Sequence, residues 1–329
     1  MKTVKEKPGR EDWTNMAAPR QSGSRSAFVL AHLSDPHLSS PAGSGFVPLL
    51  NKRILGYLAW RYHHRHVNCP HILAAMLRDL AVAAPDHVVV TGDITYLGLP
   101  HELREASLWL RRLGPPERVT LVLGNHDAYV AKAWQEAQRA WAPYLAGDCQ
   151  AMAAASLPAV RVRGPLALIG LSSARPSAPF LAVGSLGDDQ LEHFAAALAA
   201  AHRRGLLRIV LLHHSPVPGG IAWHKRLTDA HRFLDVLGRQ GAELILHGHA
   251  HVTQVRELYA GTRTIPIFGV AAASDSRPDP QYTARYHLYR FEREANGWML
   301  TVTARSFCPA QGRFTMLQQW HLPLPVTLP

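Results

Sequence analysis

The sequence Val119-Thr-Leu-Val-Leu-Gly-Asn-His-Asp127 contains the most informative pattern in this chain. Four of its first five residues are apolar and three of the five are β-branched, as in a short buried strand. The run ends in Gly-Asn-His-Asp at positions 124–127. The segment therefore predicts a strand that delivers polar side chains at its carboxyl end.

Four other strand-like runs end in the same way. They are Ala27 to Ser34, Val88 to Thr91, Leu207 to Leu212 and Glu243 to Leu246. Helical patterns lie between the runs, at Ile72 to Ala83, Glu102 to Leu113, Val130 to Trp141, Leu186 to His202 and Leu227 to Arg239. Strands that alternate with helices favour an α/β architecture. Sheets of this kind bind ligands at the carboxyl ends of their strands, where all five polar clusters fall.

The pattern changes after residue 264. Ile265 to Val270, Tyr282 to Phe291 and Trp298 to Arg305 look like strands with no helices between them. We therefore predict a second sheet that is partly antiparallel. Ser185, followed three residues later by Asp188, predicts a capping box at the start of the fourth helix.

The polar clusters supply the ligands that borderline divalent metals prefer. They are Asp35-Pro36-His37, Gly92-Asp93, Gly124-Asn125-His126-Asp127, His213-His214 and Gly248-His249-Ala250-His251. Each contributes Asp, Asn or His and none contributes a thiolate, which indicates Mn, Fe or Zn. Residues one apart in an extended strand end point the same way, so each Asp-x-His or His-x-His pair can address one metal. One isolated histidine is more often a surface residue than a ligand, but the ordered set predicts metal binding.

The set resembles the signature of the calcineurin-like metallophosphoesterase superfamily, which is Asp-x-His, Gly-Asp, Gly-Asn-His-Asp, His and Gly-His-x-His in that order. The resemblance covers residues 35–251. Within the superfamily the chain looks most like bacterial class III cyclic-nucleotide phosphodiesterases. The resemblance implies a four-layer α/β/β/α sandwich of two mixed sheets, with the metal site at the carboxyl ends of the strands.

The resemblance also implies two metal ions, divalent or mixed-valence. One ion takes Asp35, His37, Asp93 and His251, and the other takes Asp93, Asn125, His213 and His249, so that Asp93 bridges them. Two divalent ions carry more positive charge than two aspartates neutralise, which leaves charge for a bridging hydroxide and a phosphate. In such centres the ions lie roughly 3.5 to 4 Å apart, and the hydroxide attacks the phosphoester.

His126 is the candidate donor of a proton to the leaving oxygen, because it neighbours a ligand but is not needed as one. Asp127 is the candidate that orients its imidazole. Many relatives carry an acid three residues after the bridging aspartate, where this chain has Tyr96, so Tyr96 is a candidate substrate contact. The family's double-histidine pattern favours His213 as the ligand and leaves His214 as a further substrate contact.

Composition narrows the class of protein. The 329 residues are 47% hydrophobic and 18% charged, which excludes a disordered or collagen-like chain. No stretch of 18 uncharged apolar residues occurs, so we expect no membrane-spanning helix. Residues 1–25 lack the apolar core of a secretory signal, which predicts a cytoplasmic protein. The three cysteines are far apart and suggest neither a disulfide framework nor a thiolate zinc site.

The net charge of +11 is unevenly distributed. Residues 1–25 carry +3, and residues 51–66 carry +4 through Lys52, Arg53, Arg61 and Arg65. We expect residues 1–26 to be a basic disordered extension, 27–307 the phosphoesterase domain with a cap insertion at 38–70, and 308–329 a C-terminal tail. Arg61 and Arg65 are candidate contacts to an anionic substrate.

Residues 49–66 also interleave basic residues with Ile54, Leu55, Tyr57, Leu58, Trp60 and Tyr62. Such a segment is either a helix of the core or a basic aromatic face for a membrane surface or an anionic lipid. The second interpretation would make the protein peripheral to the inner face of the membrane.

The sequence thus predicts a dinuclear metal-dependent hydrolase of a small phosphodiester, with a 3′,5′-cyclic nucleotide as one candidate. One alternative is a membrane-surface pyrophosphohydrolase or phosphodiesterase that acts on a lipid-linked anionic substrate. An alternative of another class is a non-catalytic metal-binding scaffold. No recognised nucleic-acid module accompanies the charge, so we do not expect a nucleic acid partner. The oligomeric state stays open.

Overall fold

The computed structural model describes residues 27–38, 52–61, 67, 69–148, 157–277 and 279–325. The predicted N-terminal extension, most of the predicted cap insertion and Arg65 lie outside these residues.

The first sheet is mixed and has the strand order β12-β11-β10-β1-β2-β3. Its strands are β1 (Ala27–Leu33), β2 (His87–Val90), β3 (Val119–Leu121), β10 (Arg285–Glu294), β11 (Gly297–Cys308) and β12 (Arg313–Pro325). The three N-terminal strands are parallel to one another, and β10, β11 and β12 extend the sheet in antiparallel pairs. The carboxyl ends of β1, β2 and β3 therefore share one edge.

The second sheet is also mixed and has the order β4-β5-β6-β7-β9-β8. Its strands are β4 (Ala159–Arg163), β5 (Leu166–Gly170), β6 (Leu207–Leu211), β7 (Leu244–His247), β8 (Gln254–Ala260) and β9 (Arg263–Gly269). The four inner strands are parallel, while β4 and β8 are antiparallel edge strands. The inner strands β5, β6 and β7 are wholly buried, as expected for parallel strands covered on both faces.

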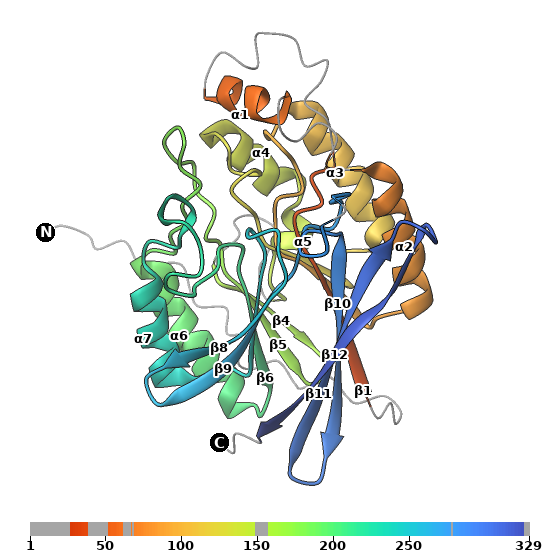
Figure 1. Ribbon diagram of the computed structural model, residues 1–329. Helices are drawn as coiled ribbons and strands as arrows, with labels where there is room; N and C mark the ends of the chain where they lie inside the picture. The colour runs from red at the N-terminus through yellow and green to blue at the C-terminus, as the bar shows by residue number, and fades with distance from the viewer. Residues whose placement is uncertain are drawn as a thin grey trace, which may run out of the picture.

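Helices cover the two outer faces of the sheet pair, as Figure 1 shows. Those on the first sheet are α2 (Pro70–Ala83), α3 (Pro100–Leu113), α4 (Ala131–Ala140) and α5 (Ala142–Leu145), and those on the second are α6 (Asp188–Arg203) and α7 (Ala230–Gln240). A third apolar core, which includes Leu30, Val89, Leu168 and Phe268, fills the space between the sheets. The fold is the predicted four-layer α/β/β/α sandwich.

The short helix α1 (Arg53–Ala59) is the described part of the predicted insertion. Arg53 is buried and donates hydrogen bonds to the carbonyls of Leu97 and Gly98, at 2.9 and 2.6 Å. Tyr57 and Trp60 pack against the buried Leu97 and Leu99. The helix is therefore anchored on the loop between β2 and α3, and one of its four predicted charges serves this anchoring.

The predicted C-terminal tail is wrong, because residues 313–325 form β12. This strand pairs with β11 from Cys308↔Arg313 to Gly297↔Pro325 and buries Phe314 and Leu324. It is an edge strand, where proline is tolerated, so Pro323 and Pro325 do not break it. The strands β4, β5 and β8 were also not predicted.

The predicted capping box at Ser185 is wrong as well. Helix α6 begins at Asp188, after Gly187 with φ 80°, and Ser185 donates instead to the Asp229 carboxylate at 2.9 Å. That carboxylate also accepts hydrogen bonds from the backbone N–H groups of Leu186 and Gly187. A side chain distant in sequence thus supplies the acceptors that a local cap would have supplied.

None of the helices in the described residues has the length and hydropathy that crossing a bilayer requires.

His87 and His287 are buried in the cores as neutral imidazoles. Each has one ring nitrogen without a hydrogen-bond partner among the described residues. Burial, with a smaller contribution from nearby arginines, lowers the pKa of each to about 3. In an unfolded chain histidine titrates near pH 6.5, as a rough average. The unfolded state therefore binds more protons than the native state between these two values, and stability falls as the pH falls through this window.

We expect His287→Phe to reduce this acid sensitivity, by about 1.4 kcal/mol per pH unit for one histidine. Phenylalanine suits the site because the His287 ring lies among Phe268, Tyr289 and Trp320. Urea unfolding at several pH values between about 6 and 4 measures the slope. His321→Gln, at an exposed position of β12, is the control that should keep the parent slope. An unchanged slope in His287→Phe would contradict the prediction.

Candidate metal centre

The predicted ligands come together where the two sheets present their carboxyl ends. Asp35 and His37 follow β1, Asp93 follows β2 and Asn125 follows β3 of the first sheet. From the second sheet His213 follows β6, and His249 and His251 follow β7. The site therefore lies across the two sheets.

Two groups of side chains place their ligand atoms within 4.8 Å of one another: Asp35, His37, Asp93 and His251 form the first, and Asp93, His213 and His249 form the second. They share Asp93, whose Oδ2 lies 3.3 Å from His213 Nε2. Asn125 Oδ1 lies 3.0 Å from the same nitrogen and so belongs beside the second group. These are the two ligand sets that the resemblance implied. They separate His249 from His251, so the expectation that this His-x-His pair addresses one metal is wrong.

The backbone is strained at the ligands. Among the described residues, seven that are not glycine have positive φ, and five of these seven are predicted ligands: Asp35, His37, Asp93, His249 and His251, with φ between 40° and 68°. Such conformations cost of order 1 to 3 kcal/mol each and occur mostly where the surrounding structure holds a functional group in place. The strain is consistent with a site that aims side chains at one point.

Glycine is required next to two of the ligands because the chain approaches them closely. A Cβ at Gly124 would overlap the Asp93 carboxylate, and a Cβ at Gly248 would overlap the Ser34 hydroxyl. The glycines of the Gly-Asn-His-Asp and Gly-His-x-His clusters therefore allow neighbouring loops to close around the site.

Backbone carbonyls fix the orientation of four site histidines. Nδ1 faces a carbonyl in three of them: His37 at 3.1 Å from Thr95, His213 at 2.7 Å from Thr91 and His126 at 2.6 Å from Tyr96. In His249 it is Nε2 that faces the Lys225 carbonyl, at 3.0 Å. A ring nitrogen that donates to a carbonyl leaves the opposite nitrogen for a metal or a proton. Any residue can supply a carbonyl, so no sequence signal could have revealed these partners.

Electrostatics keep the carboxylates charged. Burial acts to raise the pKa of Asp93, but the neighbouring His213 and His126 hold it well below its usual value. Burial lowers the pKa of His37 to about 3 and that of His249 well below its usual value, so both are neutral, as a metal ligand must be. His213 differs, because the carboxylates beside it outweigh burial and raise its pKa to about 9. A metal ion held by His213 would take the place of a proton.

The residues fit a pair of cations. The donors are carboxylate, imidazole and amide groups, which suit Mn, Fe or Zn. Asp35 Oδ1 is buried and lies 3.2 Å from His251 Nε2, while Oδ2 accepts from the backbone N–H of His249 at 3.1 Å. A buried charged carboxylate is costly unless a cation balances it.

The role predicted for Asp127 is wrong. Its carboxylate accepts hydrogen bonds from the Thr95 backbone and hydroxyl and from the Gly124 backbone, at 2.9 to 3.0 Å, and it does not orient His126. Burial, together with the charge of Asp93, raises its pKa to about 7. Asp127 holds together the loops that carry Asp93 and Asn125, and the Tyr96 carbonyl orients His126 instead.

The predicted substrate contacts are placed differently from one another. His214 is buried, with Nδ1 2.8 Å from Ser173 Oγ and Nε2 3.2 Å from the Ala182 carbonyl, so both nitrogens have partners outside the two ligand groups. The Tyr96 ring is also buried and packs beside His37 and His126. Arg61 is exposed at the end of α1, and Arg65 lies outside the described residues. Among the described residues, the structure does not bring Tyr96, His214 and Arg61 together.

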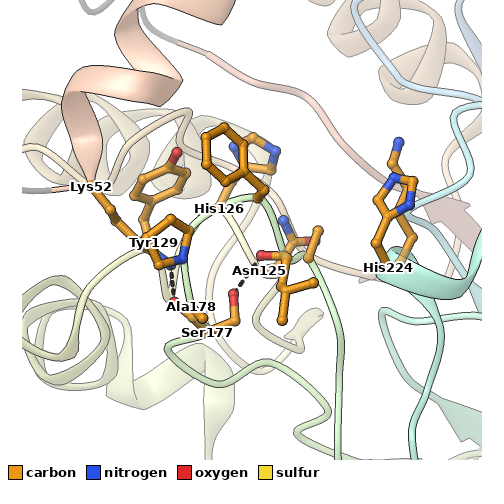
Figure 2. Close-up of a pocket in the computed structure, with 12 residues that line it drawn as sticks. Lys52, Asn125, His126, Tyr129, Ser177, Ala178 and His224 are labelled. Carbon is orange, nitrogen blue, oxygen red and sulfur yellow. Dashed lines mark hydrogen bonds between the residues drawn. The ribbon is translucent and has the colours of Figure 1, made fainter.

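A cavity of about 270 Å³ opens beside the second group of ligands; we call it the basic cavity. Its lining includes Lys52, Asn125, His126, Tyr129 and residues 177–182 and 224–225. Lys52 reaches from the start of α1 to the Ser177 carbonyl at 2.7 Å, and Figure 2 shows His224 across the cavity from it. Lys52 was expected only as part of a basic segment, and Tyr129 carries no signal in the sequence that marks it as a site residue.

The chain matches the family model for calcineurin-like phosphoesterases over residues 28–253. A probable cyclic nucleotide phosphodiesterase of a Synechococcus strain is 29% identical over 226 residues, which cover 68% of this chain and 78% of that protein. A glycerophosphodiester phosphodiesterase of Enterobacter lignolyticus is 30% identical over 258 residues, which cover 76% of this chain and 82% of that protein.

Solved structures show the same fold. A dimetal phosphatase from Danio rerio superimposes with a TM-score of 0.55 at 12% identity, over 90% of this chain and 99% of that one. A purple acid phosphatase from yellow lupin seeds gives a TM-score of 0.60 at 10% identity, over 90% of this chain and 54% of that one. At these identities the likeness concerns the architecture alone.

Proposed function

The chain belongs to the calcineurin-like phosphoesterase family and is a metal-dependent phosphoester hydrolase, and on this premise we propose that its substrate is a phosphodiester. One observation carries the proposal: two ligand groups share the Asp93 carboxylate, and His126 Nε2 lies 4.0 Å from that carboxylate at the wall of the basic cavity. The names of the two curated relatives support the diester class, since both are phosphodiesterases.

When bound, a pair of divalent ions would activate a water molecule and neutralise the charge of the phosphoryl group. Asp35, His37, Asp93 and His251 would hold one ion, and Asp93, Asn125, His213 and His249 the other. The remaining task is to supply a proton to the oxygen that leaves when its bond to phosphorus breaks. His126 is suited to this task because Tyr96 occupies Nδ1, so an imidazolium would present its second proton from Nε2.

The experiment is a substrate panel with Mn, Fe or Zn added to the full chain. It contains 3′,5′-cyclic nucleotides, glycerophosphodiesters, a nitrophenyl diester and a nitrophenyl monoester. We expect diesters to exceed the monoester by about tenfold or more in kcat/KM, a difference of about 1.4 kcal/mol. A preference for the monoester would overturn the diester assignment, and no hydrolysis of any member would favour the non-catalytic scaffold.

Exposed apolar residues favour a second candidate function, the hydrolysis of a lipid-linked phosphoester at a membrane surface. Ile54 and Leu58 are 46% and 41% exposed on α1, while Phe180 and Trp223 are 82% and 68% exposed on the loops that line the basic cavity. Aromatic side chains next to cations are typical of membrane interfaces. Activity on a lipid-linked pyrophosphate that requires liposomes or detergent would support this candidate, and equal activity on a water-soluble analogue would exclude it.

A further inference from the structure

The basic cavity lies on the side of the site where the leaving group must go. Its lining includes both His126, the proposed donor of the proton to the leaving oxygen, and Asn125, a proposed metal ligand. A proton donor must come within hydrogen-bond distance of the oxygen that it protonates. With the phosphoryl group at the metal centre, the leaving alcohol would therefore extend into this cavity.

The charges in this cavity have one sign. Lys52 and Lys225 line it, His224 lies beside Lys225, and none of its described lining residues is Asp or Glu. Lys52 is half-buried: its ammonium donates to the Ser177 carbonyl at 2.7 Å and lies 4.7 Å from the centre of the Tyr129 ring. An ammonium group has three donors, and among the described residues one of them serves the Ser177 carbonyl, which leaves N–H groups of Lys52 for a ligand.

The position of Lys52 is fixed by the packing of its helix. The next residue, Arg53, is tied to the carbonyls of Leu97 and Gly98, and the Gly56 backbone lies close to the Tyr129 ring. Figure 2 shows Lys52 and Tyr129 on the same side of the cavity. A lysine side chain that packing already holds in place loses less conformational freedom on binding an anion than a mobile surface lysine loses.

We propose that the basic cavity is a binding subsite for a second anionic group, carried by the alcohol that leaves, and that Lys52 and Lys225 bind this group. The proposal rests on the proposed function and narrows it to phosphodiesters with a carboxylate or second phosphate on the leaving alcohol. A 3′,5′-cyclic nucleotide has no such group, since its one negative charge is on the phosphoryl group itself.

A matched pair of non-hydrolysable probes tests the subsite. (2-Carboxyethyl)phenylphosphinate and its carboxamide have nearly the same shape, and only the first carries a second charge. Calorimetry on the full chain, with and without added Mn, measures the affinity of each probe. We expect the carboxylate to bind about tenfold more tightly than the carboxamide, in the range of a charge-assisted contact.

Lys52→Met and Lys225→Met keep most of the aliphatic stem and remove the charge. We expect each to lower the preference for the carboxylate severalfold and the double variant to bring it close to one. Lys132→Met is the matched control, because Lys132 is an exposed lysine on α4 whose side chain is 82% exposed, and it should keep the parent preference. Thermal unfolding of each variant checks that the fold is intact.

Two results would overturn the subsite: no preference in the parent chain, or variants that weaken both probes by the same factor. The second result would mean that the lysines attract only the phosphinate charge. Because the readout is binding, a failure of the subsite stays distinct from a failure of the proposed function, which would appear as no hydrolysis of any panel substrate.

Discussion

Replacing Asp93 with alanine will leave the protein with neither metal ion and lower its activity by roughly 10⁴-fold or more, which is a barrier increase of about 5 kcal/mol. Asp93 is shared by the two ligand groups, and each of its carboxylate oxygens contacts the site. Oδ2 lies 3.3 Å from His213 Nε2, while Oδ1 accepts a hydrogen bond from the His126 backbone at 2.8 Å. One substitution therefore removes a ligand from both ions.

Elemental analysis of purified Asp93→Ala and Asp93→Asn measures the bound metal, and circular dichroism checks the fold. The asparagine variant keeps the shape and one oxygen, so it separates loss of charge from loss of packing. His249→Ala is the matched control, because His249 belongs only to the second group and its loss should mainly empty one position. Two ions still bound to Asp93→Ala would disprove the shared position.

The layers of the fold could be predicted because most of the parallel strands have a local signal. Val119 to Leu121 and Leu207 to Leu211 are short buried runs that end in polar clusters, and both form strands as predicted. The strand β12, at the edge of the first sheet, carries a weaker signal. In β12 the exposed Met316 and Leu317 are adjacent, which breaks the alternation that identifies a strand, and pairing with β11 compensates.

The residues that cluster in the two groups could be predicted because metal chemistry restricts which side chains can serve as ligands, whereas the groups that position them could not. Thr91, Thr95 and Lys225 act through carbonyls that every residue possesses. The role of Asp127 was mistaken for a similar reason, because its neighbour in sequence, His126, turns toward the Tyr96 carbonyl. Because Asp127 and His126 are adjacent in the sequence, a contact between their side chains was expected. In the folded loops His126 contacts the Tyr96 carbonyl instead.

Removing the His126 imidazole should slow the hydrolysis of a diester with a poor leaving group by roughly 10² to 10⁴-fold, the usual contribution of a positioned proton donor. His126→Ala should keep both metals, because His126 belongs to neither ligand group. The loss should shrink for nitrophenolate, which leaves without needing a proton. Steady-state rates for an alkyl and a nitrophenyl diester measure this difference.

The matched control is His224→Ala, which removes another imidazole from the wall of the same cavity. If His126 donates a proton, His126→Ala should slow hydrolysis of the alkyl diester more than that of the nitrophenyl diester. His224→Ala should change the two rates by a similar factor. Equal losses for the two diesters in His126→Ala would instead mean that the ring serves binding or shape. The geometry supports a role for His126 as a proton donor, because Nδ1 faces the Tyr96 carbonyl and the side chain, which is 24% exposed, lines the cavity.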